Sequence, residues 1–182
     1  LIPESRARGY KKGRYSFNVK GVGAVILGVV ADGKMTKHTI LKVLPGTKTT
    51  QARSIQKHDD EFDTASEGDR VGLALKNVKV DDVERGTVLT SDTSVKTSKQ
   101  IQAQASLVKY WSTPLKEGMV VHLGHWMQFL NGKIESVTGE DWKNPEIALI
   151  LEKEIVHRPG DTAVLMYLEG GKLRVAGTVM LP

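Results

Sequence analysis

Residues 54–89 restrict the fold of this chain more than any other segment. Apolar and small residues alternate over residues 71–75, with the two-residue period of a half-buried β-strand. Turn signals stand on either side, at Glu67-Gly68-Asp69 and Arg85-Gly86, because glycine adopts positive φ easily and aspartate bonds nearby backbone. No helical period of useful length occurs in residues 14–90, beyond a possible single turn at residues 81–84. The segment predicts short antiparallel strands joined by tight turns.

The rest of the chain repeats this pattern on both sides of a polar stretch. Residues 91–98 are rich in serine and threonine and lack a strong apolar period, so we place a domain boundary there. Asp32-Gly33 and Asn131-Gly132 are typical of two-residue hairpin turns. The sequence predicts an all-β fold of two consecutive antiparallel β-barrels, residues 14–92 and 93–182, after a basic arm of residues 1–13. Strands are expected at residues 17–30, 39–44, 48–55, 71–75, 88–89, 100–109, 119–130, 133–137, 146–151, 162–168 and 173–181.

The positive charge of the chain is concentrated at its start. The net charge is +5, and residues 1–20 carry six basic residues and one acidic residue, so the other 162 residues hold 20 of each sign. The arm therefore fits either a solvated linker or a segment that meets phosphates, which release counterions when lysine and arginine bind. The absence of cysteine fits a reducing compartment, and no apolar stretch is long enough to span a bilayer. We expect a cytoplasmic protein without membrane contact.

No group of residues has the spacing of a catalytic or metal site. His122 and His125 are three residues apart, an offset that puts their side chains on opposite faces of a strand. The acids of residues 59–63 lack calcium-loop spacing and indicate a solvated hairpin tip. The phosphate-binding pattern G-x-x-x-x-G-K-S/T is absent, and three tryptophans without interleaved basic residues form no base-stacking platform. These observations predict a binding or scaffolding protein that is not an enzyme, with no catalytic residue and no metal ligand.

Several segments resemble domains 2 and 3 of the EF-Tu-like translation GTPases. The sequence F-N-V-K-G-V-G-A-V-I-L-G-V-V-A-D-G-K at residues 17–34 is similar to the start of domain 2, and residues 53–75 and 81–89 are similar to its second half. The motifs R-S-I-Q and A-S-E-G-D-R-V-G are most similar to those of the SelB branch, which serves unusual aminoacyl-tRNAs. Residues 114–125 and 159–179 resemble domain 3. Ala24 and Leu27 stand where the family usually has threonine, and the motifs of the GTPase domain are missing.

In this family, domain 2 helps to form the pocket for the aminoacylated CCA end, and domain 3 leans on the T-stem. The resemblance implies that Phe17 supports the terminal adenosine and that Gln56 bonds ribose hydroxyls. Many family members carry glutamate at the Gln56 position and a basic residue at the Asp59 position. The RNA-binding residues carried over by position are Arg14, Tyr15, Phe17, Val19, Gln56, Asp59, Gly170, Gly171 and Lys172.

The resemblance also implies a longer parent factor. A chain that starts at Leu1 and lacks a P-loop is either a fragment of a longer factor, which Leu1 favours, or a stand-alone pair of barrels. We expect it to have no cofactor of its own, because GTP and Mg²⁺ would belong to the GTPase domain of the parent. The implied partners are aminoacyl-tRNA, that GTPase domain and the ribosome, and one implied parent is the archaeal SelB-like factor proposed for pyrrolysyl-tRNA. The alternatives are a protein-interaction scaffold that has lost tRNA binding and part of an initiation-factor-2-gamma-like protein. Convergence of Arg14, Phe17, Gln56 and Asp59 on one concave patch would favour the tRNA hypothesis.

Overall fold

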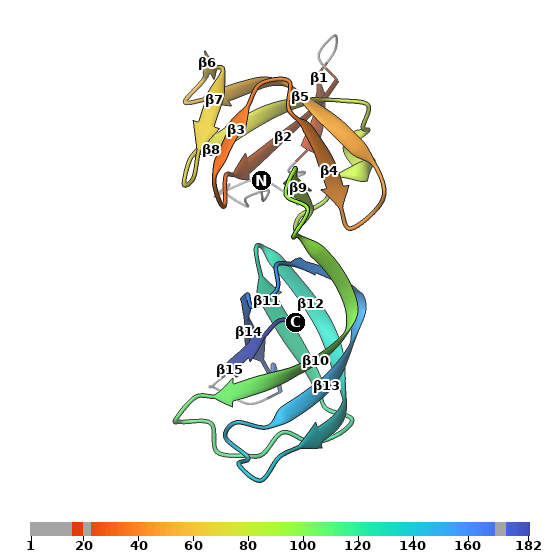
Figure 1. Cartoon of the computed structure of the whole chain (residues 1–182), viewed down its shortest axis with the longest axis vertical. Helices are drawn as coiled ribbons and strands as arrows, with labels where there is room; N and C mark the ends of the chain where they lie inside the picture. Colours follow the sequence, from red (N-terminus) through yellow and green to blue (C-terminus); the bar gives the residue numbers. More distant parts are fainter. Residues whose placement is uncertain (1–15, 20–22, 170–173) are drawn as a thin grey trace. The chain divides into compact units, whose positions relative to one another are not determined.

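A computed structural model describes residues 16–19, 23–169 and 174–182 of the chain (Figure 1). The chain divides into two compact units, of which the first ends at Asp92 and the second begins at Thr93. Both units are built from β-strands, and the all-β prediction is confirmed. Within the described ranges, no helix has the length and apolar character that crossing a bilayer requires.

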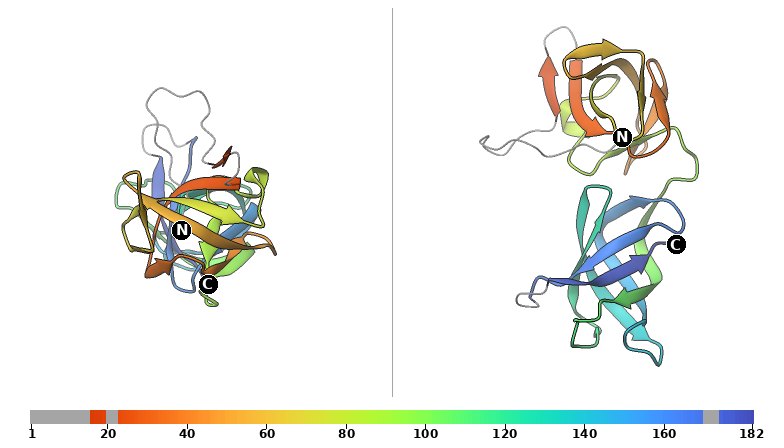
Figure 2. Two further views of the ribbon diagram at one scale, coloured as in Figure 1. Left: turned by 90° about the horizontal axis from the view of Figure 1, so that it is seen from above. Right: turned by 90° about the vertical axis from the view of Figure 1, so that its left-hand side faces the viewer.

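The first unit is a twisted antiparallel sheet with a small second sheet beside it. The larger sheet has the strand order β1-β2-β8-β5-β4-β9, with β6 paired to β5, and β3 pairs with β7. Figure 2 shows these strands curving round a common interior. The elements are β1 Ser16–Val19, β2 Gly23–Val29, β3 Lys34–Thr36, β4 Ile40–Leu44, β5 Thr49–Lys57, β6 Asp60–Phe62, β7 Thr64–Ser66, β8 Arg70–Lys76, the 3₁₀ turn η1 Val80–Asp82 and β9 Val88–Thr90.

Alternation along the strands creates the core of the first unit. Ile26, Leu73 and Ile55 are cross-strand neighbours on β2, β8 and β5, and none of the three is exposed to solvent. Full burial of an aliphatic side chain of this size stabilises a fold by about 1.5–3 kcal/mol. The residues on either side of Ile26, Leu73 and Ile55 in the chain point to the opposite face of the sheet. These three strands therefore present a second, outward row of side chains.

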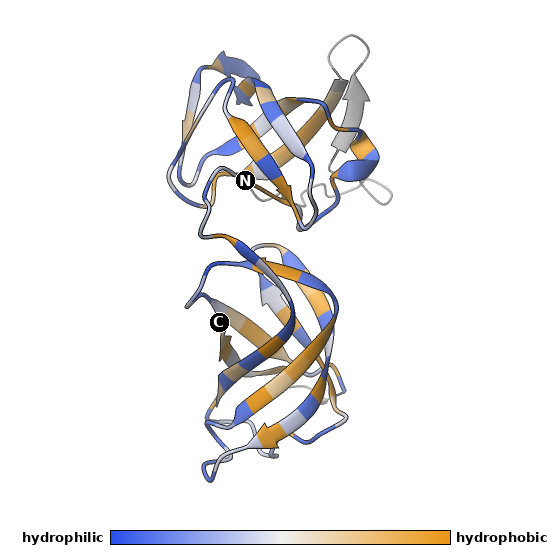
Figure 3. Ribbon diagram, turned by 45° about the vertical axis from the view of Figure 1, so that its right-hand side comes forward, coloured by the Kyte–Doolittle hydropathy of each residue, from blue (hydrophilic) through white to orange (hydrophobic). Residues whose placement is uncertain are grey.

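The second unit is a closed barrel in which β15 pairs with β10. The strand order is β10-β13-β12-β11-β14-β15, and Leu123 and Leu165 are paired, fully buried residues of its interior. Figure 3 shows hydrophobic and hydrophilic bands alternating along its long strands, as expected when one face is buried. The strands are β10 Lys96–Leu107, β11 Val120–His125, β12 Gln128–Thr138, β13 Glu146–His157, β14 Thr162–Met166 and β15 Val175–Met180.

Two predicted hairpin turns are wrong. Asn131-Gly132 lies inside β12, and the β11–β12 turn is instead Trp126-Met127. A Cβ at Gly132 would lie 2.8 Å from Leu151 Cδ2, so the Leu151 side chain would have to shift to admit one. Asp32-Gly33 forms a turn with Gly33 at φ 71°, but β2 pairs with β1 and β8 whereas β3 pairs with β7. That turn therefore joins two sheets and not the arms of one hairpin.

The β11–β12 turn is unusual because neither of its two central residues is glycine. Trp126 and Met127 have φ of 43° and 64°, a left-handed conformation that costs side-chain-bearing residues roughly 1–2 kcal/mol each. The Trp126 ring stacks on His125 at 4.6 Å and lies 5.6 Å from the Arg158 guanidinium carbon. These ring contacts, together with bonds made by the adjoining Gln128, hold the turn in place.

Gln128 acts as an extra rung between β12 and β13. Its side-chain amide donates to the Val156 carbonyl at 2.7 Å, and the Val156 amide donates to Gln128 Oε1 at 2.8 Å. Gln128 Nε2 also donates to the His125 carbonyl at 3.3 Å. Gln128 is buried, so these bonds satisfy backbone groups that water does not reach.

His122 and His125 point to opposite faces of β11, as predicted. His125 is buried, and His122 lies half-buried on the outer side, stacked on Phe129 at 5.0 Å. His125 Nε2 lies 3.1 Å from Asp161 Oδ2. Burial lowers the pKa of His125 below its usual value, although the Asp161 carboxylate acts in the opposite direction.

The second unit should lose stability as the pH falls below 6.5, the usual value for a histidine. Because the pKa of His125 is lower in the folded state, the unfolded chain binds more protons in the range just below 6.5, and the free energy of unfolding decreases there. Urea unfolding at a series of pH values, followed by tryptophan fluorescence, measures this slope. All three tryptophans lie in the second unit, so the signal reports that unit.

The His125→Asn variant is the control for this slope, because asparagine does not titrate. It should be less stable at every pH but should lose much of the pH dependence in the window below 6.5. An unchanged slope in the variant would show that another group is responsible.

Candidate nucleic-acid interface

A hollow of about 260 Å³ opens on the outer face of the first unit, where β2, β8 and β5 are neighbours. The strand register places Leu27, Gly72 and Gln56 in one row across these three strands. The row forms the floor of the hollow, and the β5–β6 turn and the start of β8 form its edge. The lining residues are Leu27, Gly28, Gln56, His58, Asp59, Arg70, Val71 and Gly72.

Gly72 keeps the middle of the floor flat. A Cβ at this position would lie 3.7 Å from Leu27 Cδ2 and 3.8 Å from Gln56 Cβ, which are ordinary contact distances. The space that a side chain would take is therefore open between a leucine methyl and an amide. Leu27 is 47% exposed, so a ligand that settled here would bury apolar surface.

The β5–β6 turn forms the edge of the hollow. Lys57 pairs with Asp60, which leaves His58 and Asp59 as a two-residue hairpin turn. Their φ angles of 52° and 71° are those of a type I′ turn, which suits the right-handed twist of a hairpin. The turn places His58 and Asp59 at the edge of the hollow.

The lining combines a floor of apolar and polar residues with opposite charges at its edge. Asp59 and Arg70 supply a carboxylate and a guanidinium, and Gln56 supplies an amide that both donates and accepts. Over the described part of the chain, no three acidic or histidine side chains are placed to hold a metal ion. Among the described residues, the lining therefore offers a ligand both apolar contact and hydrogen-bonding groups.

The structure brings two of the predicted site residues together. Gln56 and Asp59 both line the hollow. Phe17 and Val19 belong to β1, where they pair with Val25 and Gly23 of the adjacent β2. The remaining predicted residues, Arg14, Tyr15, Gly170, Gly171 and Lys172, lie outside the described residues.

Sequence reasoning missed Leu27, His58, Arg70 and Gly72 as members of the site. Gly72 carried a usable signal, because glycine inside a strand often marks close approach of another group. His58 gave none, since a type I′ turn without glycine or asparagine has no characteristic sequence. Its neighbour Asp59 was assigned by position in the family, and the acids around it were interpreted only as a solvated tip.

The family model, the curated relatives and the solved structures that match this chain include translation elongation factors and an uncharacterized protein. Residues 23–90, which include the whole hollow, match the family model of elongation factor Tu domain 2. The selenocysteine-specific elongation factor of Methanocaldococcus jannaschii is 29% identical over 171 residues. The crystal structure of the elongation factor SelB from Methanococcus maripaludis has a TM-score of 0.77 and 27% identity over 91% of the chain. The chain is SelB/EF-Tu-like, and its residues 23–90 match elongation factor Tu domain 2.

The SelB-like chain spans only part of each of these proteins. It covers 36% of the selenocysteine-specific factor and 40% of the SelB structure. It is also 37% identical, over 88% of its own length, to an uncharacterized protein of Methanocaldococcus jannaschii, of which it covers 50%. The expectation that the chain is related to translation elongation factors of the SelB type is confirmed, and its link to pyrrolysyl-tRNA stays a prediction.

Proposed function

We propose that the first unit binds the aminoacylated 3′ end of a tRNA as part of a SelB-like elongation factor. The observation that carries the proposal is the hollow whose floor is the bare backbone of Gly72 between Leu27 and Gln56. It lies within the segment that matches EF-Tu domain 2, and two residues assigned to CCA-end contacts line it.

The lining fits the chemistry of a terminal adenosine. The flat face of the base packs against the apolar Leu27 side chain and the Gly72 backbone, which has no side chain above it. The Gln56 amide bonds ribose hydroxyls, and the Asp59 carboxylate accepts from a hydroxyl or from the α-ammonium group of the amino acid. This unit thereby senses both the nucleotide and the aminoacyl ester without performing chemistry on either.

The second unit is proposed to contact the tRNA stem and to dock the GTPase domain of the factor. Its barrel has an exposed apolar face on β12, β11, β14 and β15, which are adjacent in the barrel order. Phe129, Val164, Val175 and Met180 on this face are 51%, 39%, 40% and 56% exposed. Clusters of exposed apolar residues typically mark protein contacts, which supports the docking role.

Filling the floor of the hollow should abolish much of the binding. In the Gly72→Val variant the added methyl groups occupy the space of the base, and affinity for a CCA trinucleotide carrying a 3′-amide-linked amino acid should fall about tenfold or more. The wild-type affinity is expected to be micromolar or weaker, since residues 21–182 have no net charge to attract phosphates. NMR titration measures both the affinity and the residues that shift.

Thr49→Val is the matched control, because Thr49 is exposed on β5 and does not line the hollow. Its affinity should equal that of the wild type. Shifts spread over the second unit alone, or equal binding by Gly72→Val, would contradict the proposal.

The exposed apolar face favours one second candidate, a protein-interaction scaffold that has kept the fold and lost tRNA. The same titration separates the two. A scaffold would show no shifts at Leu27, Gln56 and Gly72 at any trinucleotide concentration, whereas the tRNA-binding module would show them there first.

A further inference from the structure

The turn that forms the edge of the hollow is tied to the rest of the first unit on both of its sides. Lys57 precedes His58-Asp59, and Glu61 follows shortly after. Each makes an ion pair with a residue from a different loop. Neither Lys57 nor Glu61 lines the hollow itself.

Lys57 is held between an acid and an aromatic ring. Its ammonium lies 3.1 Å from Asp69 Oδ2 and 4.3 Å from the centroid of the Phe62 ring. The Lys57 side chain is 21% exposed. Asp69 is fixed in turn by the Ser66 amide, which donates to the same oxygen at 2.9 Å, and that bond together with Lys57 lowers the pKa of the Asp69 carboxyl. Lys57 thereby fastens the β5–β6 hairpin to the loop before β8.

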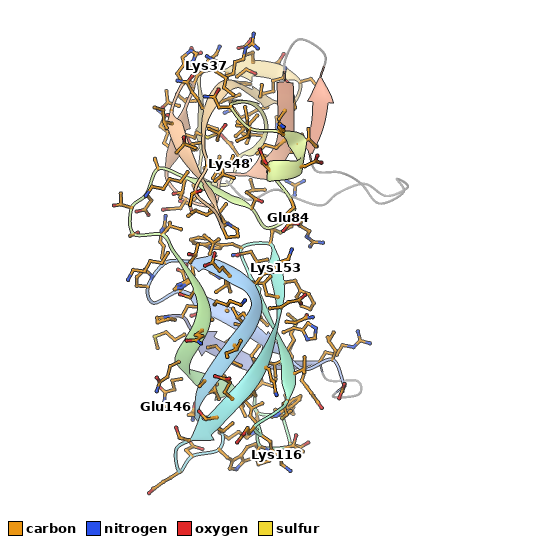
Figure 4. All side chains as sticks on the ribbon, turned by 90° about the vertical axis from the view of Figure 1, so that its right-hand side faces the viewer. Lys37, Lys48, Glu84, Lys116, Glu146 and Lys153 are labelled. Atoms are coloured by element: carbon orange, nitrogen blue, oxygen red, sulfur yellow. The ribbon has the colours of Figure 1, made fainter. Side chains whose placement is uncertain are left out.

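Glu61 makes the second tie. Its carboxylate lies 2.5 Å from Lys37 Nζ, and the Lys37 backbone amide donates to the Asp63 carbonyl at 2.8 Å. Figure 4 labels Lys37 at the end of the first unit farthest from Lys48 in that view. The two ties act on opposite arms of one hairpin.

The ties support a turn that contains no glycine. His58 and Asp59 both adopt positive φ, and neither is glycine. Left-handed backbone costs a residue with a side chain roughly 1–2 kcal/mol, although aspartate and histidine adopt it more often than most residue types. The type I′ geometry that presents Asp59 to the hollow therefore depends on contacts outside the turn.

We infer that Lys57 and Glu61 are positioning residues, which set the edge of the ligand hollow through their ion pairs with Asp69 and Lys37. The inference rests on the proposed function for its effect on binding, and on the geometry of the hairpin alone for its effect on the turn. It gives the site an unusual property. Binding of an uncharged ligand becomes sensitive to salt, because salt screens the two ion pairs.

The test uses the 182-residue chain and adenosine, which has no phosphate and so no counterion-release term of its own. Replacing Lys57 by methionine keeps the length of the side chain and removes both the ion pair and the cation–π contact. Affinity for adenosine should fall about threefold to tenfold, with no comparable loss in the urea midpoint. Lys57→Arg should restore most of the affinity, and the salt dependence seen in the wild type should be weaker in Lys57→Met.

Lys48→Met is the matched control, since it breaks a different exposed ion pair of the same unit, Lys48 to Asp82 at 2.6 Å. It should bind adenosine as the wild type does. Amide hydrogen exchange at Asp60 and Phe62 is the second readout and needs no ligand, and it should quicken about fivefold in Lys57→Met alone, within the range of one exposed ion pair.

The two readouts separate the possible failures. Unchanged exchange in Lys57→Met, or an equal loss of affinity in Lys48→Met, overturns the positioning role. If exchange quickens as expected but the wild type binds neither adenosine nor the aminoacylated trinucleotide, the positioning role stands and the proposed function fails.

Discussion

Gly177→Ala should unfold or severely destabilise the second unit. A Cβ at this position would overlap the Ser106 carbonyl oxygen and would lie 2.8 Å from Leu107 Cα. Both obstacles are backbone of β10, where Leu107 pairs with Gly177 at the closure of the barrel, so no side-chain rotation can relieve the clash. Overpacking of this kind costs about 3 kcal/mol or more, a large part of the stability of a domain of this size. Tryptophan fluorescence in urea measures the loss.

Gly124→Ala is the comparison for this variant. It also adds a methyl group to a strand of the barrel, but the nearest atom is Met166 Cε at 3.1 Å, the flexible end of a side chain. Its free energy of unfolding should differ from that of the wild type by less than about 1 kcal/mol. Equal stability of the two variants would mean that β10 and β15 separate more easily than the packing indicates.

Gln128→Leu should be the second most damaging change. Leucine has a similar volume, but it leaves the Val156 amide and carbonyl without partners inside the barrel. An unsatisfied buried polar group costs about 1–3 kcal/mol, so the variant should lose about 2–5 kcal/mol. The same fluorescence assay reads this loss directly, because the bonds lie within the second unit.

Gln102→Leu is the control, because it makes the same substitution at an exposed position. Gln102 is exposed on β10, and surface changes of this kind stay within about 0.5 kcal/mol. If Gln128→Leu is as stable as Gln102→Leu, then water must be able to take over the hydrogen bonds that the Gln128 amide makes to Val156.

Local alternation was sufficient to predict most of the strands. Residues 71–75 alternate so clearly that β8 follows from period alone, and the apolar run of residues 146–151 marks the first half of β13. The 3₁₀ turn η1, Val80–Asp82, overlaps the single helical turn expected at residues 81–84. The turn dipeptides were less reliable. Asn131-Gly132 has the composition of a type I′ turn, but both residues pair with β11, and Gly132 also pairs with Leu151 of β13.

The candidate site was only partly predictable, because it depends on strand register. Leu27, Gln56 and Gly72 become neighbours through the pairing of β2, β8 and β5, and a bulge between Ala52 and Ser54 sets which residues of β5 face outward. A shift of one residue would turn Gln56 inward. Gln56 and Asp59 were found through family resemblance, whereas the floor at Gly72 required the three-dimensional pairing.

The two hairpin turns without glycine have a consequence for the design of variants. Residues 58–59 and 126–127 adopt positive φ without glycine or asparagine, and an Asn-Gly pair would adopt the same backbone at a lower conformational cost. Grafting Asn-Gly at either place is a direct route to a more robust scaffold, but the two grafts differ in what they remove. At 126–127 the graft deletes a ring stacked on His125, and at 58–59 it removes two residues that line the hollow. At each of these two-residue turns, a change that raises the stability of the fold therefore also removes side chains that make contacts or line the hollow.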